Sequence, residues 1–201
     1  MPALPQPLHD VVEQLSALPG LGPKSALRMA LTLLKWPESR TRELGRSIAD
    51  LRDALCLCSR CNSLSDADPC PLCADPSRNA DMLCLVSEWD SLLALEAGGF
   101  YRGQYFILGG LFAPLDGMDT DTLELEKLRR RLAEGQVREL VLALGATLEA
   151  ENTASYLKNM LERDFPDTSL TRLAQGIPLG AEVRYMDKET LRQSLTHRQK
   201  L

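Results

Sequence analysis

Two tight cysteine pairs place the strongest constraint on how this 201-residue chain can fold. The pairs are Cys58-x-x-Cys61 and Cys70-x-x-Cys73, and eight residues separate them. A two-residue spacer lets both thiolates of one turn reach the same tetrahedral ion, and the short connection brings the second pair to that ion. The spacing therefore predicts a four-cysteine site for structural Zn²⁺. The alternatives are two disulfides or four unrelated buried thiols, which the regular spacing disfavours.

A module of this size cannot build a hydrophobic core of its own, so we expect metal binding and local folding to be one event. The zinc finger, residues 56–76, is thus predicted to be a structural part of something larger. Two more cysteines lie outside the pairs, Cys56 just before the first ligand and Cys84 in an apolar run. Only Cys56 is placed to substitute for a ligand.

Composition and charge limit the classes of protein to consider. The chain is 44% hydrophobic and 5% aromatic, as is usual for a soluble cytoplasmic protein. No apolar stretch approaches membrane-spanning length, and no secretory signal precedes the chain, so we expect a cytoplasmic protein. Residues 1–60 carry a formal charge of +2 and residues 61–201 carry −7, which together give the −5 of the whole chain. A polyanion is therefore expected to bind at the amino-terminal end.

The first part of the chain, residues 1–55, is predicted to be helical. Apolar residues recur at helical spacing up to the turn Pro19-Gly20-Leu21-Gly22-Pro23, and a second helix starts near Lys24. The cations Lys24, Arg28 and Lys35 are expected to share one face of it, apart from an apolar stripe. The stripe comprises Ala26, Leu27, Ala30, Leu31 and Leu34. A third helix with Leu44, Ile48 and Leu51 leads to the cysteines.

This helical hairpin has the chemistry of a phosphate-binding site. Its glycines let backbone amides approach a phosphate closely, and the start of the next helix offers N–H groups and the positive end of its dipole. Lys24 and Arg28 add counter-charge. We therefore expect Gly20, Gly22, Lys24 and Arg28 to bind DNA through its backbone, without reading base sequence. An ordinary helical hairpin with solvated lysines is the alternative.

Strands and helices alternate along residues 80–174. Buried strands are predicted at 82–86, 105–108, 140–144 and 170–173, with helices between them, the last over 152–164. Such alternation indicates a mostly parallel sheet with flanking helices. In the final part, 175–201, a short strand is expected at 183–186 and a helix after the cap residue Asp187.

Three acidic residues follow strands of this predicted sheet. Glu88 comes after the first strand, and Glu149 and Glu151 come after the third. The carboxyl ends of parallel strands are where ligands bind, so these carboxylates are expected at one edge. Oxygen ligands there would suit Mg²⁺. The alternative is that the acids simply occupy exposed loops.

A glycine hairpin, a four-cysteine module and an alternating sheet, in this order, make the chain resemble the RecR family of bacterial recombination mediators. The third part resembles a Toprim domain. The resemblance runs from about residue 4 to the end. Besides the cysteine spacing it includes the runs from Leu18 to Ala26, from Pro114 to Gly117 and from Gly176 to Glu182.

The resemblance implies a protein that acts without catalysis. RecR-like proteins form rings or clamps on DNA, and with RecO and RecF they help to load RecA onto single-stranded DNA. A homo-oligomer, most simply a tetramer, is implied, as is a nucleoid-associated location in the cytoplasm. Two other readings stay open: a Mg²⁺-dependent Toprim phosphotransferase or nuclease, and a zinc-stabilised adaptor that never contacts DNA.

The chain departs from the family pattern around the acidic residues. Ser87 stands where the family usually has the leading Toprim glutamate, and Ala150 replaces the glycine between Glu149 and Glu151. These changes disfavour Mg²⁺ chemistry, since a displaced carboxylate points in another direction. We therefore expect Glu88, Glu149 and Glu151 to be vestigial Toprim acids that face a protein partner. The Walker-B-like turn from Gly176 to Gly180 has no Walker A loop beside it, so we expect a subunit contact there.

Overall fold

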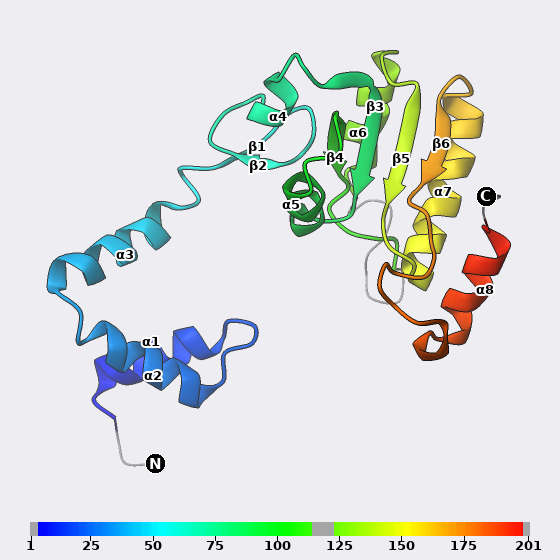
Figure 1. Ribbon diagram of the computed structural model, residues 1–201. Helices are drawn as coiled ribbons and strands as arrows, with labels where there is room; N and C mark the ends of the chain where they lie inside the picture. Colours follow the sequence, from blue (N-terminus) through cyan, green and yellow to red (C-terminus); the bar gives the residue numbers. More distant parts are fainter. Residues whose placement is uncertain (1–3, 114–122, 199–201) are drawn as a thin grey trace. The chain divides into compact units, whose positions relative to one another are not determined.

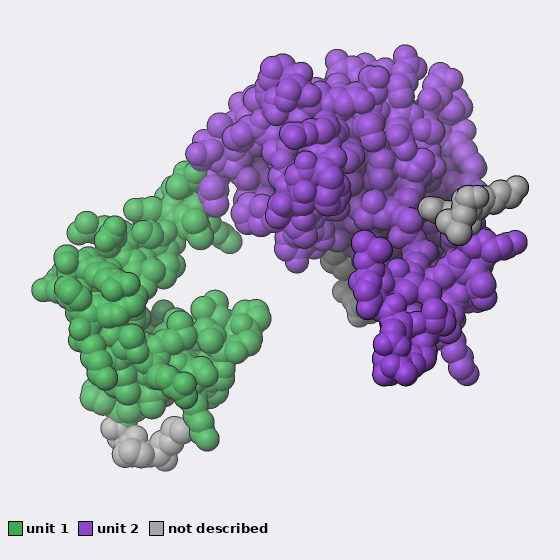
Figure 2. Space-filling model, in the orientation of Figure 1, with its two compact units in different colours: residues 1–54 green, residues 55–201 purple. Residues whose placement is uncertain are grey.

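The computed structural model describes residues 4–113 and 123–198. The predicted family motif Pro114-Leu115-Asp116-Gly117 lies outside these residues. The chain divides into two compact units, residues 1–54 and residues 55–201 (Figure 2).

The first unit is helical, as predicted, and its first two helices pack against each other as a hairpin. Its helices are α1 (Gln6–Ser16), α2 (Pro23–Leu33) and α3 (Glu38–Asp50). Among its described residues only Ala26 and Ala30 are fully buried apolar residues. The apolar stripe predicted on the second helix is therefore only partly covered, since Leu31 and Leu34 at its far end are 43% and 71% exposed. These leucines stay open because three short helices cannot enclose a full apolar face.

The second unit opens with the cysteine module. Its antiparallel strands β1 (Cys56–Leu57) and β2 (Leu64–Ser65) contain two residues each, and a single helical turn, α4 (Pro71–Ala74), follows. The four paired cysteines form the buried centre of this module. So small a module depends on its cysteines for a core.

Four parallel strands form the main sheet, as the alternation predicts (Figure 1). They are β3 (Asn79–Val86), β4 (Gly103–Ile107), β5 (Glu139–Ala143) and β6 (Ser169–Arg172). Their order is β4-β3-β5-β6, with Cys84 opposite both Tyr105 and Val141. The chain adds β4 on one side of β3, and then β5 and β6 on the other side. In open parallel sheets, ligands bind beyond the carboxyl ends of the strands at the point where this order changes.

Successive side chains along each strand point to opposite faces of the sheet, so the core has two layers. On one face Leu83, Leu85 and Leu140 pack against α6 (Leu125–Ala133) and α7 (Leu148–Asp164). On the other face Cys84 and Val86 pack with Leu92 of α5 (Trp89–Ala97). Strands buried on both faces explain the continuous apolar runs in the sequence.

Helix α7 begins earlier than predicted, at Leu148 instead of residue 152. Thr147 caps it, because its Oγ1 accepts a hydrogen bond from the Ala150 amide at 3.3 Å. Glu149 and Glu151 therefore belong to the first turn of a helix and do not lie in a loop.

The predicted strand at 183–186 is wrong. These residues form a 3₁₀ helix, η3 (Val183–Tyr185), in which the Met186 amide donates to the Val183 carbonyl at 3.2 Å. Val183 and Tyr185 are exposed, and no strand of the part of the chain that the structure describes pairs with them. The helix after Asp187 is confirmed as α8 (Lys188–Thr196), and the Asp187 carboxylate accepts the Thr190 amide at 2.9 Å.

Candidate metal centre and nucleic-acid interface

The four paired cysteines come together as the spacing predicts. The Sγ atoms of Cys58, Cys61, Cys70 and Cys73 lie within 4.8 Å of one another, and all four residues are buried. The Sγ atoms of Cys61 and Cys70 are 3.5 Å apart, near the edge of about 3.8 Å expected for a tetrahedron with Zn–S bonds of about 2.3 Å. All six cysteines of the chain lie in the described part and are free thiols, so the disulfide alternative is wrong.

Backbone hydrogen bonds shape the turn that carries the first cysteine pair. The Asn62 amide donates to the Cys58 carbonyl at 3.0 Å, and the Cys58 amide donates to the Ser63 carbonyl at 2.8 Å. The Cys70 amide points at the Cys58 Sγ, 3.3 Å away. Asn62 itself adopts a left-handed conformation with φ of 64°, which Asn tolerates better than most residues. The turn thus aims two thiols inward and supplies a donor to a thiolate.

The pKa values of three of these thiols are shifted, as is expected where several thiols share one buried site. Burial raises the pKa of Cys58, but the amides of Cys70, Cys61 and Arg60 outweigh it and bring that pKa down to about 7. Burial raises the pKa of Cys70 to about 11. The Cys73 thiol, together with burial, raises the pKa of Cys61 far above its usual range. A divalent cation among the four would offset the repulsion that opposes their ionisation. The cluster therefore fits, and supports, zinc binding.

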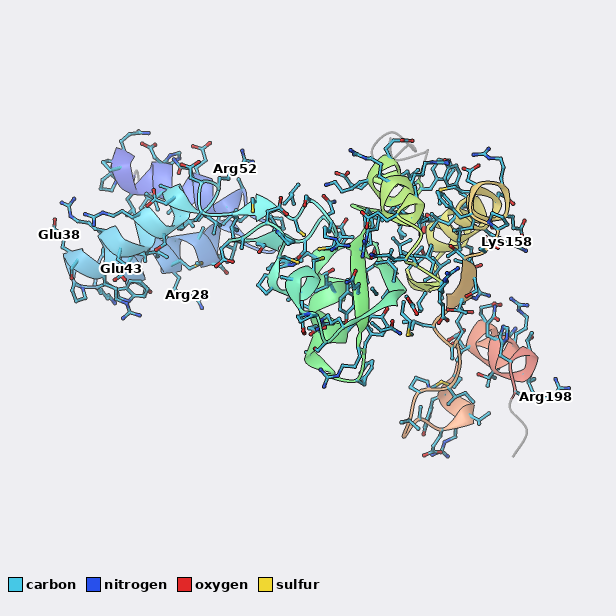
Figure 3. The ribbon with its side chains drawn as sticks, turned by 90° about the horizontal axis from the view of Figure 1, so that it is seen from above. Arg28, Glu38, Glu43, Arg52, Lys158 and Arg198 are labelled. Carbon is cyan, nitrogen blue, oxygen red and sulfur yellow. The ribbon has the colours of Figure 1, made fainter. Side chains whose placement is uncertain are left out.

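The glycine turn between α1 and α2 is exposed, as a phosphate site requires. Gly20 has φ of +79°, which only glycine adopts readily. Gly22 is the N-cap of α2, and no side chain caps this helix start. Lys24 and Arg28 are exposed one turn apart on α2, and Arg28 projects away from the helix (Figure 3). The four predicted DNA-binding residues thus lie on one short, accessible stretch.

Gly22 is a glycine that the fold itself does not require. Its φ is −82°, which any residue adopts, and a Cβ atom built on it has no neighbour within 4 Å. A glycine in open space with ordinary backbone angles permits the close approach of something outside the chain. A phosphate approaching the start of α2 would account for it.

The three predicted acids lie at the carboxyl ends of β3 and β5. Glu88 is exposed and is the N-cap of α5. The Glu149 backbone amide and the Thr147 hydroxyl lower the pKa of the Glu149 carboxyl. Glu151 accepts a hydrogen bond from Arg172, with 2.7 Å between Oε1 and Nη1. Among the described residues, the four cysteines are the only group of three or more His, Cys, Asp or Glu side chains whose ligand atoms all lie within 4.8 Å of one another. The three acids are therefore not assembled into a metal site.

Sequence reasoning missed Arg172, because its contact with Glu151 depends on the register between β5 and β6. It also missed the docking of the cysteine module on the sheet through Asn62. One signal for Asn62 was present, since asparagine after a ligand cysteine suits a left-handed turn. Thr147, with acids two and four residues later, was a signal for the earlier start of α7.

Comparisons with known proteins agree with this arrangement. The matching family models are RecR, helix-hairpin-helix over residues 8–52, the RecR zinc finger domain with four cysteines over 55–75, Toprim domain over 81–174 and RecR, C-terminal over 176–199. Recombination protein RecR of Nitratidesulfovibrio vulgaris (strain Miyazaki F) is 66% identical over 201 residues, covering all of both chains. The chain belongs to the RecR family.

Other relatives support the same family membership. Recombination protein RecR of Maridesulfovibrio salexigens is 60% identical over the full length of both chains. That of Moorella thermoacetica is 40% identical over 98% of each chain. Membership of this recombination-protein family, with its Toprim domain, supports a role in recombinational DNA repair. No helix of the described residues is both long enough and apolar enough to cross a membrane.

Proposed function

We propose that this protein is a non-enzymatic recombination mediator that binds the DNA backbone through its glycine hairpin. The observation that carries the proposal is the exposed, uncapped start of α2, where Gly22, Lys24 and Arg28 lie together. Backbone amides and two cations suit phosphates, and no base-reading element is needed. In this role the protein works at the nucleoid in the cytoplasm.

Salt-dependent DNA binding tests the hairpin. The Lys24→Ala, Arg28→Ala double variant is expected to weaken binding of any sequence and to reduce the slope of log K against log salt by about 2. The matched control is Lys158→Ala, Arg198→Ala, which removes two exposed cations from α7 and the end of the chain (Figure 3). Equal DNA affinity of the two double variants would show that the hairpin is not the DNA interface.

The cysteine cluster would hold structural Zn²⁺. Cys58, Cys61, Cys70 and Cys73 supply four thiolates, and the ion would supply the binding free energy that this coreless module lacks. The ion has no part in a reaction. Atomic absorption of the purified protein is expected to give one zinc per chain.

Exposed apolar side chains support assembly with further copies of the chain. The first unit exposes leucines and isoleucine on α2 and α3, and the end of the chain exposes Leu179, Val183 and Tyr185. Such patches are uncommon on monomers and mark protein contacts. We infer a ring-like homotetramer that encloses DNA. Solution mass from light scattering tests it, and a ring is expected to stay on closed circular duplex but slide off linear duplex.

The exposed acids would face the partner proteins. Glu88, Glu149 and Glu151 give the carboxyl end of the sheet a negative surface suited to a basic surface on RecO or RecF. With these partners the protein would help load RecA onto single-stranded DNA. Glu88→Gln, Glu149→Gln is expected to weaken RecO binding while DNA binding by the hairpin is kept.

A Mg²⁺-dependent Toprim phosphotransferase or nuclease is the competing function, and the position of the acids beyond β3 and β5 favours it. Against it stand Ser87 at the leading acid position and the pairing of Glu151 with Arg172. Incubation with Mg²⁺ and varied nucleic acids decides between them. Cleavage that disappears in a Glu149→Gln, Glu151→Gln variant would establish the enzyme.

A further inference from the structure

Four consecutive residues of the zinc module each contact the Toprim domain. They are Arg60, Cys61, Asn62 and Ser63, which include a predicted ligand and the turn that follows it. Two of the contacts are made to one residue of the sheet, Ile107 at the end of β4. The Ile107 amide donates to the Cys61 carbonyl at 2.9 Å, and the Asn62 Nδ2 donates to the Ile107 carbonyl at 3.3 Å.

These bonds complete a free sheet edge. β4 is an outer strand, and among the strands of the described residues it pairs with β3 alone. The Ile107 amide points away from β3, whereas the next amide, of Leu108, points inward to the Val86 carbonyl at 2.9 Å. Cys61 and Asn62 thus take the place that a further strand would fill, and so protect exposed backbone groups at the end of β4.

The remaining contacts fix two helices. Lys127 of α6 donates to the Asn62 Oδ1 at 2.8 Å, and Arg60 pairs with Glu134 at the end of α6 at 3.3 Å. The Trp89 indole N–H in the first turn of α5 donates to the Ser63 Oγ at 3.1 Å. Trp89 directly follows Glu88, so the module anchors the helix that begins at this acid.

An apolar contact supports the same docking. Leu72 of α4, next to the ligand Cys73, packs against the cysteine cluster and also against the core layer that contains Cys84 and Tyr105. The module therefore rests on the Toprim domain from both of its cysteine pairs.

We propose that the segment Arg60–Ser63 transmits the metal state of the cysteine cluster to the Toprim domain. With the ion bound, the segment closes the edge of β4 and holds the start of α5 beside Glu88; on loss of the ion both are released. The inference rests on the proposed zinc site, because the turn has no core to keep its shape without a metal. It makes Asn62 and Ser63 positioning residues for the acidic surface proposed to bind partners.

Residue-resolved hydrogen exchange at two neighbouring amides tests this coupling. The full-length protein is compared with and without zinc, after chelation under reducing conditions and with metal content measured in both states. The Ile107 amide is expected to exchange about tenfold faster, or more, without zinc, because its acceptor lies in the module. The Leu108 amide, whose acceptor lies in β3, is the internal control and stays protected.

The outcomes separate the two proposals. Protein that never holds zinc would overturn the zinc site and the coupling together. If the protein holds zinc, and removing it leaves the exchange rate of the Ile107 amide unchanged, the coupling is overturned but the zinc site is not. An equal increase in exchange rate at the amides of Ile107, Leu108 and β5 would also overturn the coupling. Zinc would then stabilise the unit as a whole and not act through this segment.

A variant isolates the Asn62 side chain. Asn62→Gly keeps the left-handed backbone and all four thiols but removes the bonds to Ile107 and Lys127. It is expected to hold zinc fully and to show faster exchange of the Ile107 amide even when loaded, because the Asn62 side chain, which bonds the Ile107 carbonyl, no longer holds the Cys61 carbonyl against that amide. The control, Ser59→Ala, lies in the same turn, where the Ser59 amide bonds to Asp68 within the module. Wild-type Ile107 protection in loaded Asn62→Gly would contradict the role of Asn62.

Discussion

Arg172 at the end of β6 and Glu151 in the first turn of α7 form an ion pair, with 2.7 Å between Nη1 and Oε1. The pair ties a strand end to a helix start at the carboxyl edge of the sheet. It also gives Glu151, one of the three predicted acids, a cationic partner. Within the described residues, neither Glu88 nor Glu149 takes part in an ion pair, so these two carry the uncompensated charge of that edge.

Removing this pair is expected to have little effect on stability. The side chains of Arg172 and Glu151 are 42% and 48% exposed, and ion pairs so open to water contribute about 1 kcal/mol or less. Arg172→Gln should therefore lower the free energy of unfolding in urea by no more than that. A loss above about 2 kcal/mol would mean that the pair stabilises the fold through more than its charges.

Asp164 at the end of α7 is expected to make a pH-dependent contribution to stability. Arg163 and then Arg129 of α6 lower the pKa of its carboxyl below the ordinary 3.8. A carboxyl with a lowered folded-state pKa stabilises the protein above its unfolded-state pKa, and this contribution is lost as the pH falls through the folded-state value. Asp164→Asn is therefore expected to be less stable than wild type at pH 7, with a gap that narrows below about pH 4.

The difference between the two proteins is the quantity to measure, because acid affects zinc binding in both alike. Urea unfolding at a series of pH values provides it. Asp167→Asn removes a carboxylate from the same surface and serves as the control. A gap that stays constant down to about pH 2 would show that the ion pairs with Arg163 and Arg129 do not supply the effect.

Loss of zinc is expected to destabilise the second unit without removing any catalysis. Cys70→Ser should abolish zinc binding and lower the free energy of unfolding by about 2 kcal/mol or more, because a buried ligand set loses its ion. Zinc content and urea unfolding are the measurements. Cys56→Ser is the matched control, since Cys56 is exposed and outside the cluster. Full zinc content in Cys70→Ser would show that another residue can take the ligand position.

Local patterns in the sequence predicted the parts of this fold that depend on near neighbours. The cysteine spacing predicted the cluster, and the alternation of apolar runs predicted the four parallel strands. Contacts that depend on three-dimensional register were out of reach, such as Arg172 with Glu151 or Asn62 with Ile107. The short run at 183–186 has the composition of a strand, but none of the strands in residues 4–113 and 123–198 pairs with it, and Val183–Tyr185 form a 3₁₀ helix.

The same limit applies to apolar faces. Periodicity groups Leu31 and Leu34 on one side of the second helix, but it does not say what covers that side. In one copy of the chain both are exposed. Spacing within a helix is a local property, whereas burial depends on which other surface is present.

The two hairpin glycines should respond in opposite ways to the same substitution. Gly20 has φ of +79°, so Gly20→Ala places a side chain in a left-handed conformation at a cost of about 1 kcal/mol. Gly22 has an ordinary φ of −82° and open space around its Cβ position. Gly22→Ala is therefore expected to leave the free energy of unfolding unchanged, or to raise it by up to about 1 kcal/mol.

DNA affinity should respond differently from stability. A methyl group on Gly22 stands where a phosphate is expected to approach the start of α2, so Gly22→Ala should weaken binding although the fold is intact. Binding titrations beside urea unfolding separate the two effects, with Gly45→Ala as a control, because Gly45 lies in the interior of α3 and its Cβ position is open. Wild-type affinity in a stable Gly22→Ala variant would mean that DNA does not come close to this turn, and the phosphate site would have to lie elsewhere.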